Sequence, residues 1–179
     1  MDTCIDMLPK ILLTSFDTWM PHQPSNSSDD LLGKISQLNG LPDSLIFLRK
    51  LPVDYEAAPK QAIAKIDRLQ PDAVICCGMA ESREKLTVES QAFSGQDCLK
   101  TIVNLKQLVA DLPSTEISHD AGQFVCEALY YSVLKHLQLS EKSNIPCIFV
   151  HVPVLHPVNI EIIATDFSAI VQRLSLIKY

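Results

Sequence analysis

Short, continuous runs of hydrophobic residues alternate along the chain with longer segments in which hydrophobic residues recur every three or four positions. The short runs predict buried strands over residues 10–16, 45–53, 73–78 and 145–152. The periodic segments predict helices from residue 28 or 29 to Gly40, over 55–69, over 125–137, and after Asn159, which we expect to cap the last helix. Strands that alternate with helices in this way indicate right-handed crossovers and a largely parallel sheet.

The remaining segments carry weaker patterns. Residues 17–28 contain two prolines, three serines and one asparagine, which is typical of a loop. Residues 79–95 have no clean periodicity, and residues 100–112 fit a strand or a helix equally well. We therefore predict one three-layer α/β/α domain over residues 1–179, with a twisted, largely parallel central sheet. In such sheets functional groups gather at the carboxyl ends of the strands, here residues 15–19, Pro52, Gly78 and beyond, and His151.

Composition narrows the class of protein. The chain has 179 residues, of which 47% are hydrophobic and 20% charged, so it can bury a sizeable core. Fifteen basic and 21 acidic residues give a net charge of −6 with no basic block, which argues against a nucleic-acid partner. The six cysteines form no CxxC pair, and no apolar run approaches the ~20 residues that span a membrane. We expect a reduced, cytoplasmic protein without a metal site.

Two residues stand out as candidates for nucleophilic chemistry. His151 ends a strand of hydrophobic residues, and Cys126 lies in the first turn of a helix, where aligned N–H groups lower a thiol pKa. We expect strand and helix to bring both to the same edge of the sheet, as nucleophile and general base, with Glu89 available to orient the imidazole. By position alone, a structural role is favoured for each of the three.

Several blocks of the sequence resemble the pyroglutamyl peptidase I family of cysteine peptidases. Residues 11–17 (ILLTSFD) resemble its opening ILVTGFEPFGG, and residues 51–53 match its LPV. Residues 70–78 resemble KPDVVIGLG, and residues 86–89 resemble the segment with the family's catalytic glutamate. The most specific blocks are residues 121–126 (AGQFVC), similar to AGTFVCN around the nucleophile, and residues 149–153 (FVHVP), similar to FIHVP.

The resemblance implies an α/β/α enzyme that removes an N-terminal pyroglutamyl residue from short, blocked peptides through a thioester. It makes Cys126 the nucleophile, His151 the base and acid, and Glu89 the orienting carboxylate. It implies no metal and no organic cofactor, and it suggests a homo-oligomer. Its pocket positions are occupied by Phe16, Trp19, Met79, Arg83 and Phe124.

Departures from the family pattern keep other functions open. Trp19 replaces a phenylalanine, Met79 replaces a glutamine, and Glu127 follows the nucleophile where asparagine is usual. The segment between Glu89 and Cys126 is shorter than in the family, and Leu99 falls opposite a loop arginine that the family uses near the oxyanion, with Lys100 as the nearest cation. The alternatives are a peptidase with altered N-terminal acyl specificity and a non-catalytic binding protein.

Overall fold

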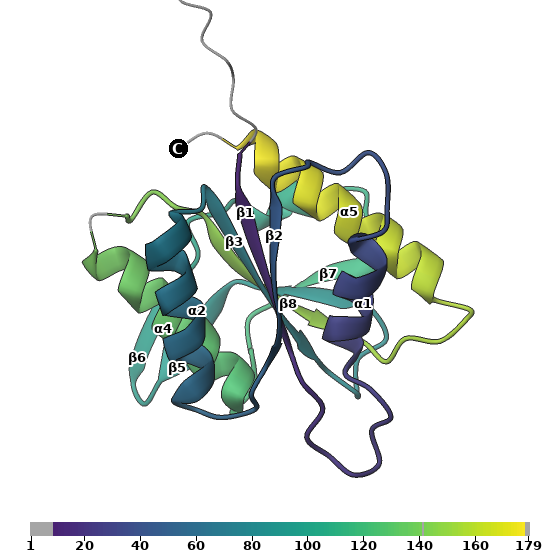
Figure 1. The fold of residues 1–179 in the computed structure, drawn as a ribbon, viewed down its shortest axis with the longest axis horizontal. Coiled ribbons are helices and arrows are strands. Elements are labelled where there is room, and N and C mark those ends of the chain that lie inside the picture. The colour runs from purple at the N-terminus through teal and green to yellow at the C-terminus, as the bar shows by residue number, and fades with distance from the viewer. Residues whose placement is uncertain (1–8, 141, 178–179) are drawn as a thin grey trace, which may run out of the picture.

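The computed structural model describes residues 9–140 and 142–177 (Figure 1). A six-stranded sheet runs through the molecule in the order β2-β1-β3-β8-β4-β7, and β5 and β6 form a separate hairpin. The strands are β1 (Ile11–Phe16), β2 (Leu45–Leu51), β3 (Ala73–Met79), β4 (Leu86–Glu89), β5 (Gln91–Ser94), β6 (Asp97–Lys100), β7 (Thr115–Ser118) and β8 (Cys147–Val152). The helices are α1 (Ser27–Ile35), α2 (Ala57–Leu69), α3 (Leu105–Leu108), α4 (Val125–Leu139) and α5 (Ile160–Leu176).

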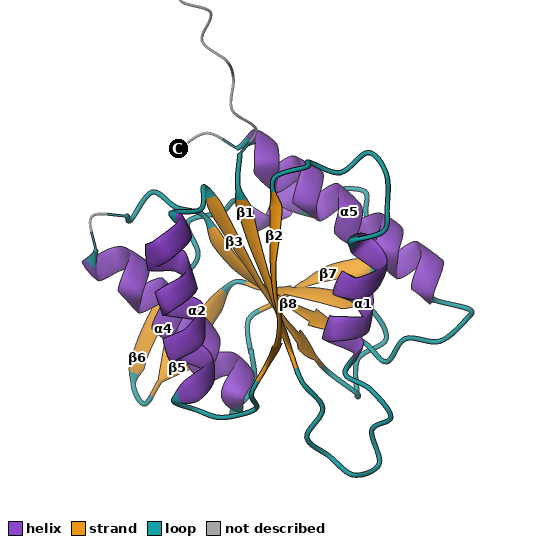
Figure 2. Cartoon of the chain, viewed as in Figure 1, coloured by secondary structure: helices purple, strands orange, loops and turns teal. Residues whose placement is uncertain are grey.

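Helices cover both faces of the sheet, which gives three layers (Figure 2). Strands β2, β1, β3 and β8 pair in parallel, whereas β4 runs antiparallel to β8 and parallel to β7. The predicted α/β/α fold with a largely parallel sheet is therefore confirmed.

The hydrophobic runs are continuous because their strands are buried on both faces. On β3, Ile75 and Cys77 pack with α1 and α5, while Val74 and Cys76 pack with α2 and α4. All four side chains are fully buried, and such burial stabilises the fold by roughly 1.5–3 kcal/mol for a large aliphatic side chain. This alternation decides which strand residues face α4, the helix that carries Cys126.

The first two helices are shorter than predicted, and side chains fix where each of them begins. Asn26 Oδ1 accepts from Ser28 N and fixes the start of α1, which ends at Ile35 rather than at Gly40. Asp54 Oδ1 accepts from the backbone N–H groups of Glu56 and Ala57, so α2 begins at Ala57 and not at Tyr55.

The last helix begins directly after Asn159 as predicted, but this side chain does not cap it. Its Oδ1 accepts from His156 N at 2.9 Å and its Nδ2 donates to Val154 O at 3.0 Å, both in the preceding loop. Asn159 therefore closes the loop that leads from β8 into α5.

The weakly patterned segments contain short elements. Residues 79–95 hold β4 and β5, residues 100–112 hold the single-turn helix α3, and β7 follows at 115–118. Four residues are too few to display a period, which is why the sequence pattern missed these strands. Strand β4 matters most, since it carries Glu89 to the side of β8.

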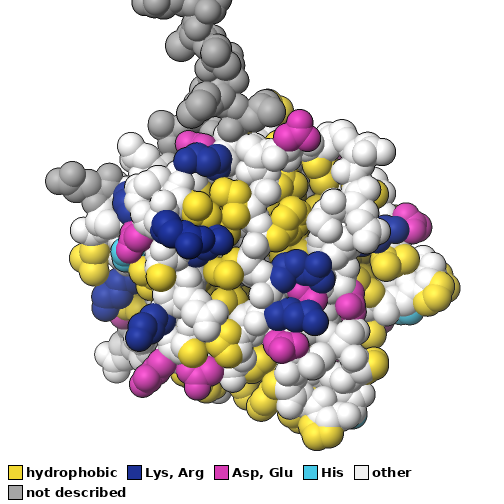
Figure 3. Space-filling model, viewed as in Figure 1, with side chains coloured by type: hydrophobic (Ala, Val, Ile, Leu, Met, Phe, Trp, Pro, Cys, Tyr) yellow, Lys and Arg dark blue, Asp and Glu magenta, His cyan; other side chains and the backbone are white. Residues whose placement is uncertain are grey.

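The surface agrees with the mixed charge of the sequence. On the face drawn in Figure 3, lysine and arginine side chains are interspersed with acidic and hydrophobic ones. None of the helices in the described part of the chain is long and apolar enough to cross a membrane.

Candidate active site

His151 lies on β8 between two strands that shape its surroundings. It pairs in register with Gly78 on the parallel strand β3 and with Thr87 on the antiparallel strand β4. Since strand residues alternate between faces, the side chains of His151, Thr87 and Glu89 project from the face that α4 covers. The imidazole is 5% exposed and lies 4.8 Å, centroid to centroid, from the Phe149 ring.

Glu89 forms a hydrogen bond with the imidazole of His151. The distance from His151 Nδ1 to Glu89 Oε1 is 2.8 Å, and the Glu89 side chain is completely buried. Burial alone would raise the pKa of Glu89, but its hydrogen bond with His151 and the positive charge of Arg83 hold this pKa below its ordinary value. Glu89 is therefore an anion that accepts from Nδ1, which leaves Nε2 of a neutral imidazole free to act as a base.

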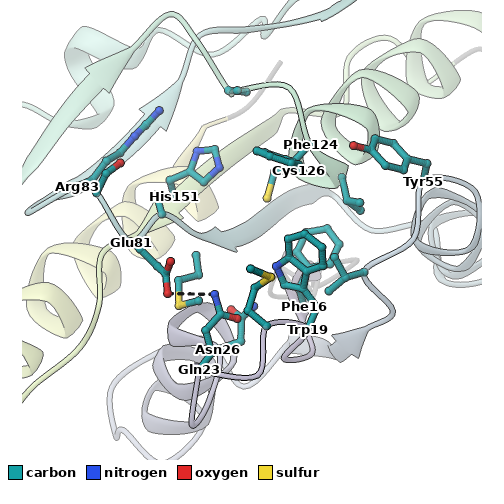
Figure 4. Close-up of a pocket in the computed structure, with 18 residues that line it drawn as sticks. Phe16, Trp19, Gln23, Asn26, Tyr55, Glu81, Arg83, Phe124, Cys126 and His151 are labelled. Carbon is teal, nitrogen blue, oxygen red and sulfur yellow. Dashed lines mark hydrogen bonds between the residues drawn. The ribbon is translucent and has the colours of Figure 1, made fainter.

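Cys126 reaches the same place from α4. Its sulfur lies 2.5 Å from the position that a Cβ on Gly78 would occupy. Because Gly78 is the register partner of His151, the sulfur lies in the space beside the imidazole. A larger residue at position 78 would fill this space. Figure 4 shows the Cys126 sulfur and the His151 ring on the same wall of a pocket that both residues line.

The expectation that the helix start lowers the pKa of the Cys126 thiol is wrong. Burial, followed by the negative charge of Glu89, raises this pKa to about 12, and the backbone N–H of Cys126 and the charge of Arg83 offset only part of the increase. The dipole of one helix end is thus the weaker effect here. In the free protein the thiol is neutral.

The pocket in front of Cys126 has a volume of about 600 Å³. The five predicted pocket residues all line it: Phe16, Trp19, Met79, Arg83 and Phe124. Trp19 and Phe124, 56% and 65% exposed, form a tilted pair at its mouth with ring centroids 6.3 Å apart. Phe16 is buried and belongs to the core as well as to the pocket wall. Met79 Sδ accepts a hydrogen bond from Ser27 N at 3.4 Å.

Sequence reasoning missed the residues that hold the loop between β1 and α1 against the pocket. Glu81 accepts hydrogen bonds from Gln23 Nε2 at 3.1 Å, drawn in Figure 4, and contacts His22 Nε2 at 3.0 Å. Tyr55 lines the pocket from the β2–α2 connection. Loop residues such as these carry no periodic signal, and their contacts join positions about 60 residues apart.

Lys100, the cation nearest to the position of the family's loop arginine, does not reach the pocket. Lys100 lies at the end of β6, in the hairpin, and does not belong to the described lining of the pocket. Arg83 lines the pocket instead and donates to Glu89 Oε1 at 2.6 Å. Within residues 9–140 and 142–177, no group of three or more His, Cys, Asp or Glu side chains is placed to hold a metal ion.

Comparison with known proteins points to one family. The sequence model described as "Pyroglutamyl peptidase" matches residues 9–112, which include Glu89. The pyrrolidone-carboxylate peptidase 2 of Caldanaerobacter subterraneus subsp. tengcongensis is 27% identical over 172 residues and 82% of each chain. The pyrrolidone-carboxylate peptidase of Bacillus subtilis is 24% identical, over 90% of this chain and 86% of the relative.

Solved structures share the fold along nearly the whole chain. The pyroglutamyl peptidase I of Bacillus amyloliquefaciens superposes with a TM-score of 0.82 at 20% identity, over 96% of this chain and 97% of that one. The pyrrolidone carboxyl peptidase of Thermococcus litoralis gives a TM-score of 0.78 at 16% identity, over 94% and 93% of the two chains. The similarity therefore extends past residue 112, through the elements that carry Cys126 and His151.

Proposed function

Because the chain belongs to the pyroglutamyl peptidase family, we propose that it hydrolyses the bond after an N-terminal pyroglutamyl residue, with Cys126 as nucleophile, His151 as base and acid, and Glu89 orienting His151. One observation carries the proposal. The sulfur of Cys126 occupies the space above Gly78, next to an imidazole whose Nδ1 lies 2.8 Å from a buried carboxylate. A nucleophile, a base and an orienting group in this relation are what acyl transfer requires.

Acylation begins from a neutral thiol, since the pKa of Cys126 is about 12. As the sulfur attacks the carbonyl carbon of the pyroglutamyl residue, the thiol proton moves to Nε2 of His151. The C–S bond forms, and the C–N bond to the next residue then breaks as His151 returns this proton to the leaving amine. Glu89 stabilises the imidazolium that exists between these two transfers.

Deacylation reverses the roles with water as the nucleophile. His151 takes a proton from water, the oxygen adds to the thioester carbon, and the C–S bond breaks. The proton on His151 passes to the departing sulfur, which restores the neutral thiol and releases free pyroglutamate. The residues involved return to their starting states, so the cycle needs no further reactant.

The tetrahedral oxyanion requires hydrogen-bond donors, and the start of α4 supplies them. The first N–H groups of a helix have no intrahelical partner. In α4 the N-cap residue Phe124 contributes no side-chain cap, and the helical bonds to its carbonyl come from Glu127 and Ala128. We assign the N–H groups of Val125 and Cys126 to the oxyanion, on the pocket side of the nucleophile.

The pocket suits an uncharged ring. Phe16, Trp19 and Phe124 offer aromatic surface, and Met79 offers a thioether where an amide is usual in the family. A lactam carries no charged amine, so an apolar pocket binds it without leaving a buried charge unpaired. The substrates are thus short peptides whose first residue is cyclised.

Turnover of a fluorogenic pyroglutamyl amide tests the proposal. The wild-type protein is expected to release the fluorophore, and Cys126→Ser is expected to lose at least 1,000-fold in kcat, as removal of a catalytic nucleophile does. An alanyl amide of the same fluorophore controls for general aminopeptidase activity. Release from the wild type that survives in Cys126→Ser would exclude the mechanism.

A non-catalytic binding protein is the second candidate, and the high pKa of Cys126 favours it, because a neutral thiol is unreactive by itself. The two functions differ in what a bound pyroglutamyl peptide undergoes. Saturable binding of the intact peptide without cleavage, measured by calorimetry and then mass spectrometry, would support the binding protein. Binding followed by free pyroglutamate would support the peptidase.

A further inference from the structure

Arg83 joins three parts of the site through one guanidinium group. It lies in the turn between β3 and β4, and its Nη1 donates to Glu89 Oε1 at 2.6 Å and to Thr87 Oγ1. Its Nη2 donates to the carbonyl oxygen of Asp120 at 2.9 Å, in the segment that leads into α4 and Cys126. Arg83 therefore contacts both the carboxylate behind His151 and the approach to the nucleophile.

Glu89 needs a cationic partner because of where it lies. Its side chain is fully buried, and within the described part of the chain its Oε2 has no hydrogen-bond partner. A buried carboxylate whose only partners are a neutral imidazole and the Thr87 hydroxyl takes up a proton more readily, because burial disfavours the charged form. The side chain of Arg83 is 25% exposed and supplies a permanent positive charge to the same oxygen that His151 contacts.

We infer that Arg83 is a positioning residue, which keeps Glu89 ionised and turned towards His151 and ties this pair to the segment that carries Cys126. The inference rests on the proposed function, since it assigns Arg83 a role in the same reaction. It replaces the expectation that Arg83 binds substrate: both Nη atoms are engaged with Glu89, Thr87 and Asp120.

The charges around Glu89 decide in which direction loss of Arg83 changes the pKa values of Glu89 and Cys126. The titratable and charged groups that face it are Arg83 from the turn before β4, His151 from β8, and Cys126, Glu127 and Tyr130 from α4. Among these, Arg83 lowers the pKa of both Glu89 and Cys126, whereas the charge of Glu89 raises the pKa of Cys126. At a pH at which Glu89 is still ionised, loss of Arg83 therefore moves both pKa values upward.

Three variants separate positioning from substrate binding and from stability alone. Arg83→Gln removes the charge, and Arg83→Lys restores it without the planar fork. Arg49→Gln is the matched control, because Arg49 makes the same kind of ion pair with buried Asp29, at 2.8 Å, and does not line the pocket. Each variant is measured for kcat and KM on a pyroglutamyl amide across pH, for melting temperature, and for the pH dependence of Cys126 alkylation by iodoacetamide.

We expect Arg83→Gln to lower kcat 10- to 100-fold with KM changed less than threefold, and to move the acidic limb of the kcat/KM profile to higher pH. Arg83→Lys should return that limb towards the wild-type position. Arg49→Gln should lower the melting temperature but leave the pH profiles of kcat/KM and of Cys126 alkylation unchanged. A higher KM in Arg83→Gln, with kcat and the acidic limb of the kcat/KM profile unchanged, would assign Arg83 to substrate binding. A lower melting temperature with unchanged pH profiles would assign it a purely structural role. Both results overturn the inference.

Alkylation keeps this test apart from the test of the peptidase, because it needs no substrate. If the wild type fails to cleave the amide, the proposed function fails, and the alkylation profile still reports on Arg83. Over the pH range in which Glu89 is ionised in both proteins, this profile should shift to higher pH in Arg83→Gln relative to wild type, and Arg83→Lys should not show the shift. Identical profiles in wild type and Arg83→Gln would overturn the inference on their own.

Discussion

The sulfur of Cys126 lies in the space that a side chain on Gly78 would fill, 2.5 Å from the position of the missing Cβ. Gly78 pairs in register with His151, so the absence of a side chain on β3 is what lets the thiol lie beside the imidazole on β8. The next nearest atom is Phe149 Cζ, 2.9 Å from the same position. The site therefore depends on a glycine in the middle of a buried sheet.

Gly78→Ala should separate Cys126 from His151. The added methyl group meets the Cys126 sulfur and the Phe149 ring. We expect kcat/KM to fall about 100-fold, because a displacement of about 1 Å in the site has an effect of this size. The free energy of unfolding should fall by about 1–3 kcal/mol, because the core is overpacked. Steady-state kinetics and urea titration measure the two effects. Gly33→Ala on α1 is the control, because its methyl group meets only the flexible end of Arg49, at 3.0 Å. Wild-type turnover in Gly78→Ala would contradict the packing described here.

Alkylation of Cys126 should report a neutral thiol. Because burial and the charge of Glu89 raise the pKa of Cys126 to about 12, the rate of reaction with iodoacetamide should climb about tenfold per pH unit from pH 6 to pH 10, without a plateau. Peptide mapping distinguishes Cys126 from the other cysteines. A plateau reached below pH 8 would reveal a thiolate in the free protein and would replace the general-base step with a preformed ion pair.

Glu89→Gln should reduce both activity and stability. The amide keeps the shape of the side chain but no longer stabilises an imidazolium, and it leaves Arg83 facing a neutral group, so we expect kcat to fall by about 1,000-fold or more.

The stability effect should depend on pH. The pKa of Glu89 is lowered below its ordinary value of 4.5, so its charge stabilises the folded state fully above that pH, and this contribution is lost as pH falls through the lowered pKa. The melting temperatures of wild type and Glu89→Gln should therefore differ most near neutral pH and converge below pH 4.5. A constant difference down to pH 3 would contradict an ionised Glu89.

Trp19→Ala should weaken substrate binding without slowing the chemical step. Trp19 and Phe124 face one another at the pocket mouth, and loss of an aromatic contact of about 1.4 kcal/mol corresponds to a tenfold change in affinity. We expect KM to rise about tenfold with kcat within twofold of wild type. Leu176→Ala, at an exposed position near the end of α5, is the control. An unchanged KM would place the pyroglutamyl ring elsewhere in the pocket.

The sequence pattern predicted the layers of the fold because its buried strands and long helices are each encoded locally. Strand β3 is a continuous hydrophobic run, and α4 repeats hydrophobic residues at every fourth position from Val125. Strands β4 and β7 escaped prediction, since four residues show no period and their pairing partners are distant in sequence.

In the candidate site, too, the sequence predicted some features and missed those that depend on tertiary contacts. Position in the predicted elements and motif resemblance together singled out Cys126, His151 and Glu89, and the structure brings all three to one place. The pKa of Cys126 was predicted in the wrong direction, because the dipole of a helix is visible in sequence whereas burial and the proximity of Glu89 are tertiary effects. The link from Arg83 to Glu89 and Asp120 was missed for the same reason.

The central claim is that Cys126 forms a thioester with the pyroglutamyl group, and a trapped intermediate tests it most directly. The wild-type protein is mixed with excess pyroglutamyl amide, quenched in acid within milliseconds and digested for mass spectrometry. The account predicts that the peptide containing Cys126 gains the mass of one pyroglutamyl group, and that Cys126→Ala yields neither this adduct nor free pyroglutamate. Release of pyroglutamate by Cys126→Ala, or an adduct on another residue, would contradict it.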